Sequence, residues 1–331
     1  MESPISTQRL ATTELQQAAS LLQHGGVVAF PTETVYGLGA DAFAPRAIRK
    51  IFQAKGRPSD NPLIAHIASE NQLDLLAIQV PQLAKDLMAA FWPGPLTLVL
   101  KKQPAVPNEV TAGLDTVAIR MPRDPLAREL IRIANTPLVA PSANRSGKPS
   151  ATTWQAVLED LDGCIDAVIC GDPTQLGIES TVVDVTTEIP VILRHGSITE
   201  EMIAGIVRDT KKSVTSSLDF EKRSPGTRHR HYQPQAQVRI YALKSETSNP
   251  NHEIEPVTPW AWIGLQPSPT LLGTVPMQVL VCDSIEAYAA NLYAFFRTCD
   301  SHGIRTIYCE QVPPYGLGRA LMDRLTRAAS S

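Results

Sequence analysis

The stretch FPTETVYGLGADA, residues 30–42, follows an apolar run at 27–30 that predicts a β-strand. Its Gly37-Leu-Gly39 segment matches the Gly-x-Gly-x-x-Ala pattern of dinucleotide loops. That segment begins seven residues after the strand, however, and a lone match of this kind is weak. We therefore expect the two glycines to let the chain turn closely past a ligand pocket.

Helices are predicted on both sides of this stretch. Thr12 or Thr13 can cap a helix that runs to about residue 24, and Pro45 begins another that runs to about residue 54. Further strands are predicted at 63–67, 96–100, 116–121, 137–140, 167–170, 180–185 and 191–194, with helices at 81–91, 125–134, 153–160 and 199–207. The alternation predicts an α/β domain, and the short spacing between 96–100 and 116–121 indicates some antiparallel pairing.

The chain is expected to hold two domains. Residues 209–235 contain few apolar residues and no periodicity, so they are predicted to be a linker between a domain at 1–208 and one at 236–331. The second is a small α/β domain with strands at 238–243, 260–265, 277–282 and 306–309, and helices at 284–298 and 317–329.

Composition excludes several classes of protein. Of 331 residues, 43% are hydrophobic and 19% charged, and no apolar run is long enough to predict a membrane span, so a cytoplasmic location is expected. The net charge of -3 argues against a broad nucleic-acid-binding surface. The five cysteines form no Cys-x-x-Cys pair and are odd in number, so neither a metal site nor a disulfide framework is predicted.

Polar residues gather where the predicted strands end, which is where open α/β sheets bind ligands. Taken singly, Arg194 is best interpreted as a solvated charge, His66 as a core imidazole, and Ser142 and Asn144 as turn formers. Arg120 alternates with apolar residues inside a strand, so burial beside an anion is as good an interpretation as exposure. Together with Lys55 and Arg57, these groups predict a cationic cavity suited to a triphosphate.

The standard nucleotide loops are absent from the sequence. Ser-Gly-Lys-Pro-Ser at 146–150 lacks the first glycine of a P-loop and has Pro149 where the hydroxyl residue belongs. Nucleophile-elbow and zinc-protease motifs are missing as well.

Seven motifs, in order, resemble the YrdC-like threonylcarbamoyl-adenylate synthases: PTETVYGLG, KGRPSDNPL, FWPGPLTLVL, AIRMP, APSANRSGKPSATT, ESTVVDV and LRHGSIT. The chain is similar to the long form of that family, in which a Ser-Pro-Gly linker leads into a small Rossmann-like domain. The resemblance implies a twisted mixed sheet with helices around a concave cationic cavity. It also implies synthesis of L-threonylcarbamoyladenylate and pyrophosphate from L-threonine, bicarbonate and ATP. A partner transferase then modifies the adenosine beside the anticodon of ANN-decoding tRNAs, so tRNA contact with this chain is expected to be indirect or weak.

The resemblance also assigns residues by their places in the motifs. Threonine contacts are expected from Thr34, His66, Arg120, Ala140 and Ser180. ATP contacts are expected from Arg57, Asn61, Thr116, Ser142, Asn144, Ser150, Arg194, His231 and Tyr232. Threonine and bicarbonate give a carbamate that is itself a nucleophile, so catalysis needs positioning and charge stabilisation, for which Lys55, Arg57 and Arg194 are the candidates, with Mg²⁺ bridging the phosphates.

The linker SPGTRHRHYQP, residues 224–234, resembles the family's lid but has Thr227 for the usual methionine and His229 for an aromatic residue. A basic flexible linker without lid function is the alternative. Two other functions stay open at this point. One is an RNA-binding module without catalysis, and the other is carbamoyl transfer of the hydrogenase-maturation type, which expects an acylphosphatase-like domain and paired-cysteine zinc fingers that this sequence lacks.

Overall fold

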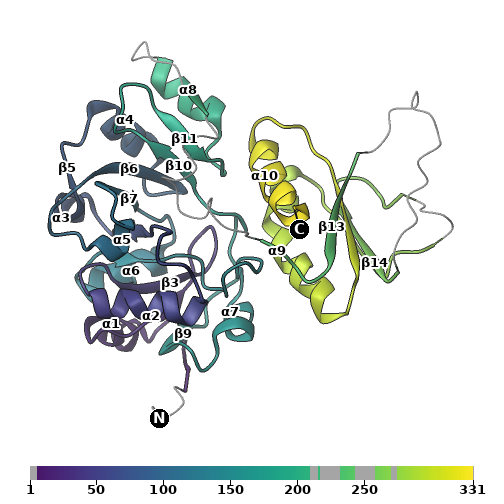
Figure 1. Ribbon diagram of the computed structural model, residues 1–331, viewed down its shortest axis with the longest axis horizontal. Coiled ribbons are helices and arrows are strands. Elements are labelled where there is room, and N and C mark those ends of the chain that lie inside the picture. The colour runs from purple at the N-terminus through teal and green to yellow at the C-terminus, as the bar shows by residue number, and fades with distance from the viewer. Residues whose placement is uncertain (1–5, 209–214, 217–231, 243–257, 270–273, 331) are drawn as a thin grey trace. The chain divides into compact units, whose positions relative to one another are not determined.

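The computed structural model describes residues 6–208, 215–216, 232–242, 258–269 and 274–330 (Figure 1). The chain divides into two compact units. Unit 1 comprises Met1–Ser146 and Ser150–His229, and unit 2 comprises Gly147–Pro149 and Arg230–Ser331. The division falls inside the predicted linker, most of which, together with His231, lies outside the described residues. The limits of 208 and 235 therefore stay predictions.

Unit 1 is built on a mixed sheet of twelve strands in the order β1-β9-β2-β3-β8-β4-β7-β6-β10-β11-β12, with β5 paired to β6 (Figure 1). Strands β6 and β7 are antiparallel, as the short spacing between them predicts, whereas β4 and β7 are parallel. The strands are β1 (Gln8–Leu10), β2 (Val28–Phe30), β3 (Gly37–Asp41), β4 (Ile64–His66), β5 (Ala77–Ile78), β6 (Leu96–Lys102), β7 (Thr116–Arg120), β8 (Leu138–Val139), β9 (Ala167–Ile169), β10 (Thr181–Asp184), β11 (Val191–Arg194) and β12 (Thr215–Ser216).

Helices cover this sheet, and helix α1 packs against α6 while α4 packs against α8. The helices are α1 (Leu15–Gln23), α2 (Pro45–Lys55), α3 (Leu73–Leu76), α4 (Gln82–Phe91), α5 (Asn108–Thr111), α6 (Pro125–Ala134), α7 (Trp154–Leu161) and α8 (Glu200–Arg208), with a 3-10 turn at Glu70–Gln72. Local signals explain α2, which begins at Pro45 and ends at Gly56 in the left-handed conformation. The predicted threonine cap of α1 is wrong, since Glu14 occupies that position without a side-chain cap.

The expectation that Gly37 and Gly39 form a turn is also wrong. They belong to β3, which pairs antiparallel with β2 and β8. A Cβ atom on Gly39 would lie 2.7 Å from the ring of Phe30, and one on Gly37 would lie 3.1 Å from the Cβ of Ala140. The glycines are therefore required by close side-chain packing across the sheet rather than by backbone freedom.

Unit 2 is a smaller α/β domain. Its four strands are all parallel in the order β13-β16-β14-β15, namely β13 (Gln237–Tyr241), β14 (Trp260–Gly264), β15 (Gln278–Val281) and β16 (Thr306–Glu310). Helices α9 (Ile285–Ser301) and α10 (Leu317–Ala329) pack on this sheet and on each other. The predicted strands and helices of the second domain are thus confirmed. Within the described part of the chain, every helix is too short or too polar to cross a bilayer.

Candidate active site

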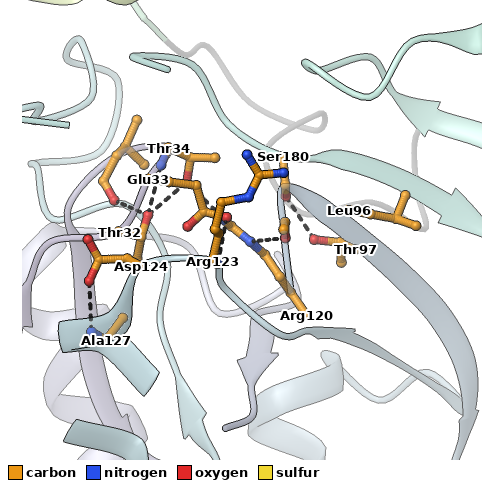
Figure 2. Close-up of polar contacts among 12 residues, drawn as sticks. Thr32, Glu33, Thr34, Leu96, Thr97, Arg120, Arg123, Asp124, Ala127 and Ser180 are labelled. Atoms are coloured by element: carbon orange, nitrogen blue, oxygen red, sulfur yellow. Dashed lines mark hydrogen bonds and ion pairs between the residues drawn. The ribbon is translucent and has the colours of Figure 1, made fainter. Parts of the chain in front are cut away.

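The segment Thr32–Thr34 after β2 forms a tight polar turn (Figure 2). The Thr32 hydroxyl donates to the carbonyl of Val35 at 2.7 Å and accepts from the Thr34 amide at 3.1 Å. Its single proton is used, so in the 2.8 Å contact between the two hydroxyls Thr34 is the donor. The Thr34 hydroxyl also accepts from Nη1 of Arg120 at 2.8 Å, which leaves it one further acceptor position and no donor.

Arg120 is buried beside Glu33. Its Nη2 lies 2.8 Å from Oε1 of Glu33, both side chains are 4% exposed, and Nε donates to the carbonyl of Gly94 at 3.2 Å. Oε1 of Glu33 also accepts from the Arg123 amide at 2.9 Å. Burial opposes ionisation of Glu33, but the Arg120 charge and the Arg123 amide outweigh it and hold the pKa of Glu33 below its ordinary value. The predicted burial of Arg120 with an anionic partner is therefore confirmed.

Strand register places Arg120 in the centre of a polar row. Arg120 on β7 is the Cα partner of His66 on β4 and of Thr97 on β6, so the three side chains share one face of the sheet. His66 is buried, and its Nδ1 lies 3.2 Å from the carbonyl of Ile64. Burial and the Arg120 charge lower the pKa of His66 to about 3, so the imidazole is neutral at pH 7.

Ser180 joins this row to Arg194. Its hydroxyl lies 2.8 Å from that of Thr97 and accepts from Nη2 of Arg194 at 3.0 Å, while its carbonyl accepts from Nε of Arg194 at 3.0 Å (Figure 2 draws the contact with Thr97). Arg194 is only 8% exposed, so the interpretation of this residue as a solvated charge is wrong. We call Thr34, His66, Thr97, Arg120 and Ser180 the Arg120 cluster.

The Lys-x-Arg and Ser-x-Asn pairs are also brought together. The ammonium of Lys55, which is 2% exposed at the end of α2, donates to the backbone carbonyls of Ser142 and Asn144, each at 2.5 Å. Nη2 of Arg57 donates to the carbonyl of Pro62 at 3.1 Å and lies 3.5 Å from that of Asn61. These contacts hold the charge of Lys55 against residues 142–144 and that of Arg57 against residues 61–62, and both segments contain predicted ATP contacts.

The other predicted residues lie in several places. The amide of Ala140 donates to the carbonyl of Ile64, the strand neighbour of His66. Ser150 donates to Glu179 at 2.6 Å. Thr116 begins β7, about 13 Å along that strand from Arg120.

Tyr232 lies in unit 2, where its ring stacks on Tyr293 with centroids 5.4 Å apart and the guanidinium of Arg324 lies 5.5 Å from the ring centroid. Its contact with ATP stays a prediction, as do the other assigned ligand contacts. Across the described residues, no group of three or more His, Cys, Asp or Glu side chains is arranged to hold a metal ion.

Neither Glu33 nor Thr97 is among the predicted site residues. Glu33 lies beside a predicted contact, but its pairing with Arg120 joins positions 87 residues apart, a distance that no local pattern reveals. Thr97 could have been noticed as the one polar residue in the apolar run LTLVL. A buried strand threonine is ordinarily a packing residue, however, and only the register with Arg120 distinguishes this one.

Two family models cover nearly the whole chain. Residues 20–196 match the Sua5, YciO and YrdC model described as "Telomere recombination", and residues 198–330 match "Threonylcarbamoyl-AMP synthase, C-terminal domain". Curated relatives named threonylcarbamoyl-AMP synthase include one from Pyrococcus abyssi, 42% identical with 97% of this chain and 96% of the relative covered. Another, from Bacillus subtilis, is 45% identical with 98% and 95% covered.

Solved structures agree with this assignment. P. abyssi Sua5 complexed with L-threonine matches with a TM-score of 0.87 at 40% identity, covering 98% of this chain and 97% of that one. Escherichia coli YciO matches 58% of this chain and 96% of its own with a TM-score of 0.50 at 23% identity, a likeness of fold alone. The chain therefore belongs to the threonylcarbamoyl-AMP synthase family and is an enzyme of its two-domain form.

Proposed function

We propose that this enzyme converts L-threonine, bicarbonate and ATP into L-threonylcarbamoyladenylate and pyrophosphate. The product then passes to a transferase that modifies the adenosine beside the anticodon of ANN-decoding tRNAs. The observation that carries the proposal is the Arg120 cluster, in which one strand row holds a fixed guanidinium beside a neutral imidazole. The L-threonine complex of P. abyssi Sua5, a relative of similar length, supports it further.

The polarity of the Arg120 cluster suits a zwitterionic amino acid. Arg120 has five N–H groups, of which Gly94, Thr34 and Glu33 engage three, so two remain for a carboxylate. Thr34 can only accept a further hydrogen bond, which suits an amino group. A neutral His66 adds no second positive charge that would repel an ammonium. We therefore propose that the threonine carboxylate faces Arg120 and that its amine faces Thr34.

The chemistry proceeds in two balanced steps. The bound ammonium first loses a proton to solvent, and the neutral amine then adds to bicarbonate and releases water, which gives a carbamate. A carbamate oxygen then attacks the α-phosphorus, and the bond to the bridging oxygen of pyrophosphate breaks. Because the carbamate is already an anionic nucleophile, no enzyme serine or cysteine is needed, and catalysis consists of alignment and charge stabilisation.

We assign that charge stabilisation to Lys55, Arg57 and Arg194. Lys55 and Arg194 are largely buried. Two backbone carbonyls hold Lys55, and the carbonyl and hydroxyl of Ser180 hold Arg194, so their charges are already in position before ATP binds. Fixed charges of this kind need little reorganisation as the pyrophosphate leaves. The proposed ATP contacts of Asn61, Thr116, Ser142, Asn144, Ser150, His231 and Tyr232 would orient the nucleotide.

We propose that Mg²⁺ enters with ATP. The ion prefers oxygen ligands and keeps several waters, and the groups assigned to the phosphates here are cations, so phosphate oxygens and water would supply its ligands. When bound, it neutralises part of the phosphate charge. No residue of this chain is assigned to it.

The direct test measures pyrophosphate release from ATP, Mg²⁺ and bicarbonate with and without L-threonine. We expect release to depend on threonine, and pyrophosphate release that is indifferent to threonine would refute the proposal. Salt-sensitive RNA binding without threonine-dependent release would instead favour the RNA-binding alternative. Relatives named threonylcarbamoyl-AMP synthase match 97% and 98% of this chain, which argues against carbamoyl transfer of the hydrogenase-maturation type.

A further inference from the structure

We propose that Thr97 is a positioning residue that makes the Ser180 hydroxyl a hydrogen-bond donor to an oxygen of the bound amino acid. The inference rests on the proposed function, because it concerns threonine recognition at the Arg120 cluster. Thr97 is not among the expected threonine or ATP contacts, and its role here is to fix Ser180 as a hydrogen-bond donor.

The position of Thr97 places it at this site. It is the direct cross-strand partner of Arg120, so the two side chains stand next to each other on the same face of β6 and β7. Its other neighbour in register is Val182 on β10, the strand that Ser180 immediately precedes. Thr97 is fully buried, and its hydroxyl lies 2.8 Å from that of Ser180.

Counting protons fixes the direction of this hydrogen bond. Within the described part of the chain, the Thr97 hydroxyl has only Ser180 as a partner, so a Thr97 that accepted from Ser180 would leave its own proton buried and unpaired. Such unpaired donors are costly and rare. Thr97 is therefore the donor, and Ser180 the acceptor.

Nη2 of Arg194 donates to the same Ser180 oxygen at 3.0 Å. A hydroxyl has two acceptor positions and one proton, so the two donors together fill both acceptor positions of Ser180. The proton of Ser180 is then the only hydrogen-bonding capacity that remains, and it can serve only an acceptor. A carboxylate oxygen is such a group, and an ammonium is not.

Ser180 and Thr34 thereby have opposite hydrogen-bonding roles toward a ligand. The Thr34 hydroxyl donates its proton to Thr32, so it can only accept a hydrogen bond from a ligand. The Ser180 hydroxyl accepts from Thr97 and Arg194, so it can only donate one. A cluster with one fixed acceptor, one fixed donor and one guanidinium matches an amino acid in a single orientation. Thr97 sets this polarity at the Ser180 end without touching the ligand itself.

The test compares Thr97→Val with Thr97→Ser by titration calorimetry of L-threonine into the full-length protein. Valine keeps the shape but removes the donor, and serine keeps the donor. We expect Thr97→Val to weaken threonine binding about 3- to 20-fold, the equivalent of part or all of one hydrogen bond to a charged group. We expect Thr97→Ser to bind within about 2-fold of the wild type, since its donor is retained.

The matched control is Thr181→Val. Thr181 is also fully buried on β10, but its hydroxyl donates to the carbonyl of Ile198 at 2.6 Å. That variant should lose stability while its affinity for threonine stays unchanged. A double-mutant cycle distinguishes the proposed role from a purely structural one. If Thr97 acts through Ser180, Thr97→Val should weaken threonine binding by less than about 2-fold further in a Ser180→Ala background.

Three outcomes separate this inference from the proposed function. A wild-type protein that binds no threonine would overturn both. Normal threonine binding by the wild type together with unchanged binding by Thr97→Val, or an undiminished effect of Thr97→Val in the Ser180→Ala background, would overturn the role of Thr97 and leave the proposed function standing.

Discussion

Replacing Glu33 with glutamine should destabilise unit 1 strongly, because Arg120 would lose its charged partner inside the protein. Both side chains of the pair are 4% exposed, so solvent screens the interaction little. Removing one partner of a buried ion pair costs about 3 to 5 kcal/mol. The glutamine carbonyl can still accept from the Arg123 amide, which favours the lower end of that range. For a domain of this size, about 3 kcal/mol lowers the melting temperature by roughly 6 °C or more.

The same variant should change the dependence of stability on pH. The folded-state pKa of Glu33 lies below its ordinary value of 4.5, so its contribution to stability is present above pH 4.5 and is lost as the pH falls through the folded pKa. The free energy of unfolding of the wild type should therefore fall more steeply below pH 4.5 than that of Glu33→Gln. Glu33 also raises the pKa of His66, so the two curves are compared above about pH 3, where His66 is neutral in both folded proteins.

Urea unfolding followed by circular dichroism at several pH values measures both effects. Glu129→Gln is the control, because it breaks an exposed pair with Arg132 in which the two side chains are 43% and 66% exposed, and it should behave as the wild type. A Glu33→Gln protein whose free energy of unfolding stays within about 1 kcal/mol of the wild type, with the same slope below pH 4.5, would refute the assignment of a buried, charged pair.

Three further predictions concern catalysis, packing and protonation. Arg57→Ala should lower threonine-dependent pyrophosphate release about 10²- to 10³-fold with an unchanged circular dichroism spectrum, and an unchanged rate would remove Arg57 from the catalytic groups. Gly39→Ala should cost about 1 to 3 kcal/mol in thermal unfolding, since the added Cβ would press on Phe30. Gly205→Ala, which meets open space in α8, should raise stability by about 0.5 to 1 kcal/mol, and equal melting temperatures for the two variants would contradict the packing of β3. Because the pKa of His66 is about 3, KM for threonine should show no inflection from His66 between about pH 5 and 8, and an inflection near about pH 6.5 that disappears in His66→Asn would count against a neutral imidazole.

The sequence supports many of these conclusions, and Arg120 illustrates why. Arg120 alternates with Val117 and Ile119 in an apolar strand, so its side chain faces the side of the sheet opposite to theirs. Burial there requires an anion, so the pattern makes a paired, buried arginine as good an interpretation as an exposed one, and the structure shows the pair. The identity of the anion could not be predicted, because Glu33 reaches Arg120 only after separate segments of the sheet have assembled.

The glycine-rich strand shows the opposite case. Gly37 and Gly39 carry no β propensity and locally favour a turn. In the folded protein the ring of Phe30, on β2, packs against Gly39, and the methyl group of Ala140, which follows β8, packs against Gly37. Strand formation here is decided by tertiary packing, which overrides the local signal.

Thr97 escapes prediction for a related reason. A single polar residue in a buried strand is compatible with a packing role anywhere along the sheet, and the sequence does not state which residue will lie opposite. The antiparallel register of β6 and β7 sets Thr97 against Arg120, and this pairing makes its hydroxyl relevant to ligand recognition.

In the proposed reaction the carbon of bicarbonate becomes the carbamoyl carbon that links the threonine nitrogen to the phosphate of AMP. The enzyme should be incubated with ATP, Mg²⁺, L-threonine and ¹³C-bicarbonate, and the products followed by mass spectrometry. We predict a threonylcarbamoyl-AMP ion that carries one ¹³C atom and forms together with pyrophosphate. A threonyl-AMP ion without the label, or pyrophosphate release that yields no adduct and does not need threonine, would contradict the proposed reaction.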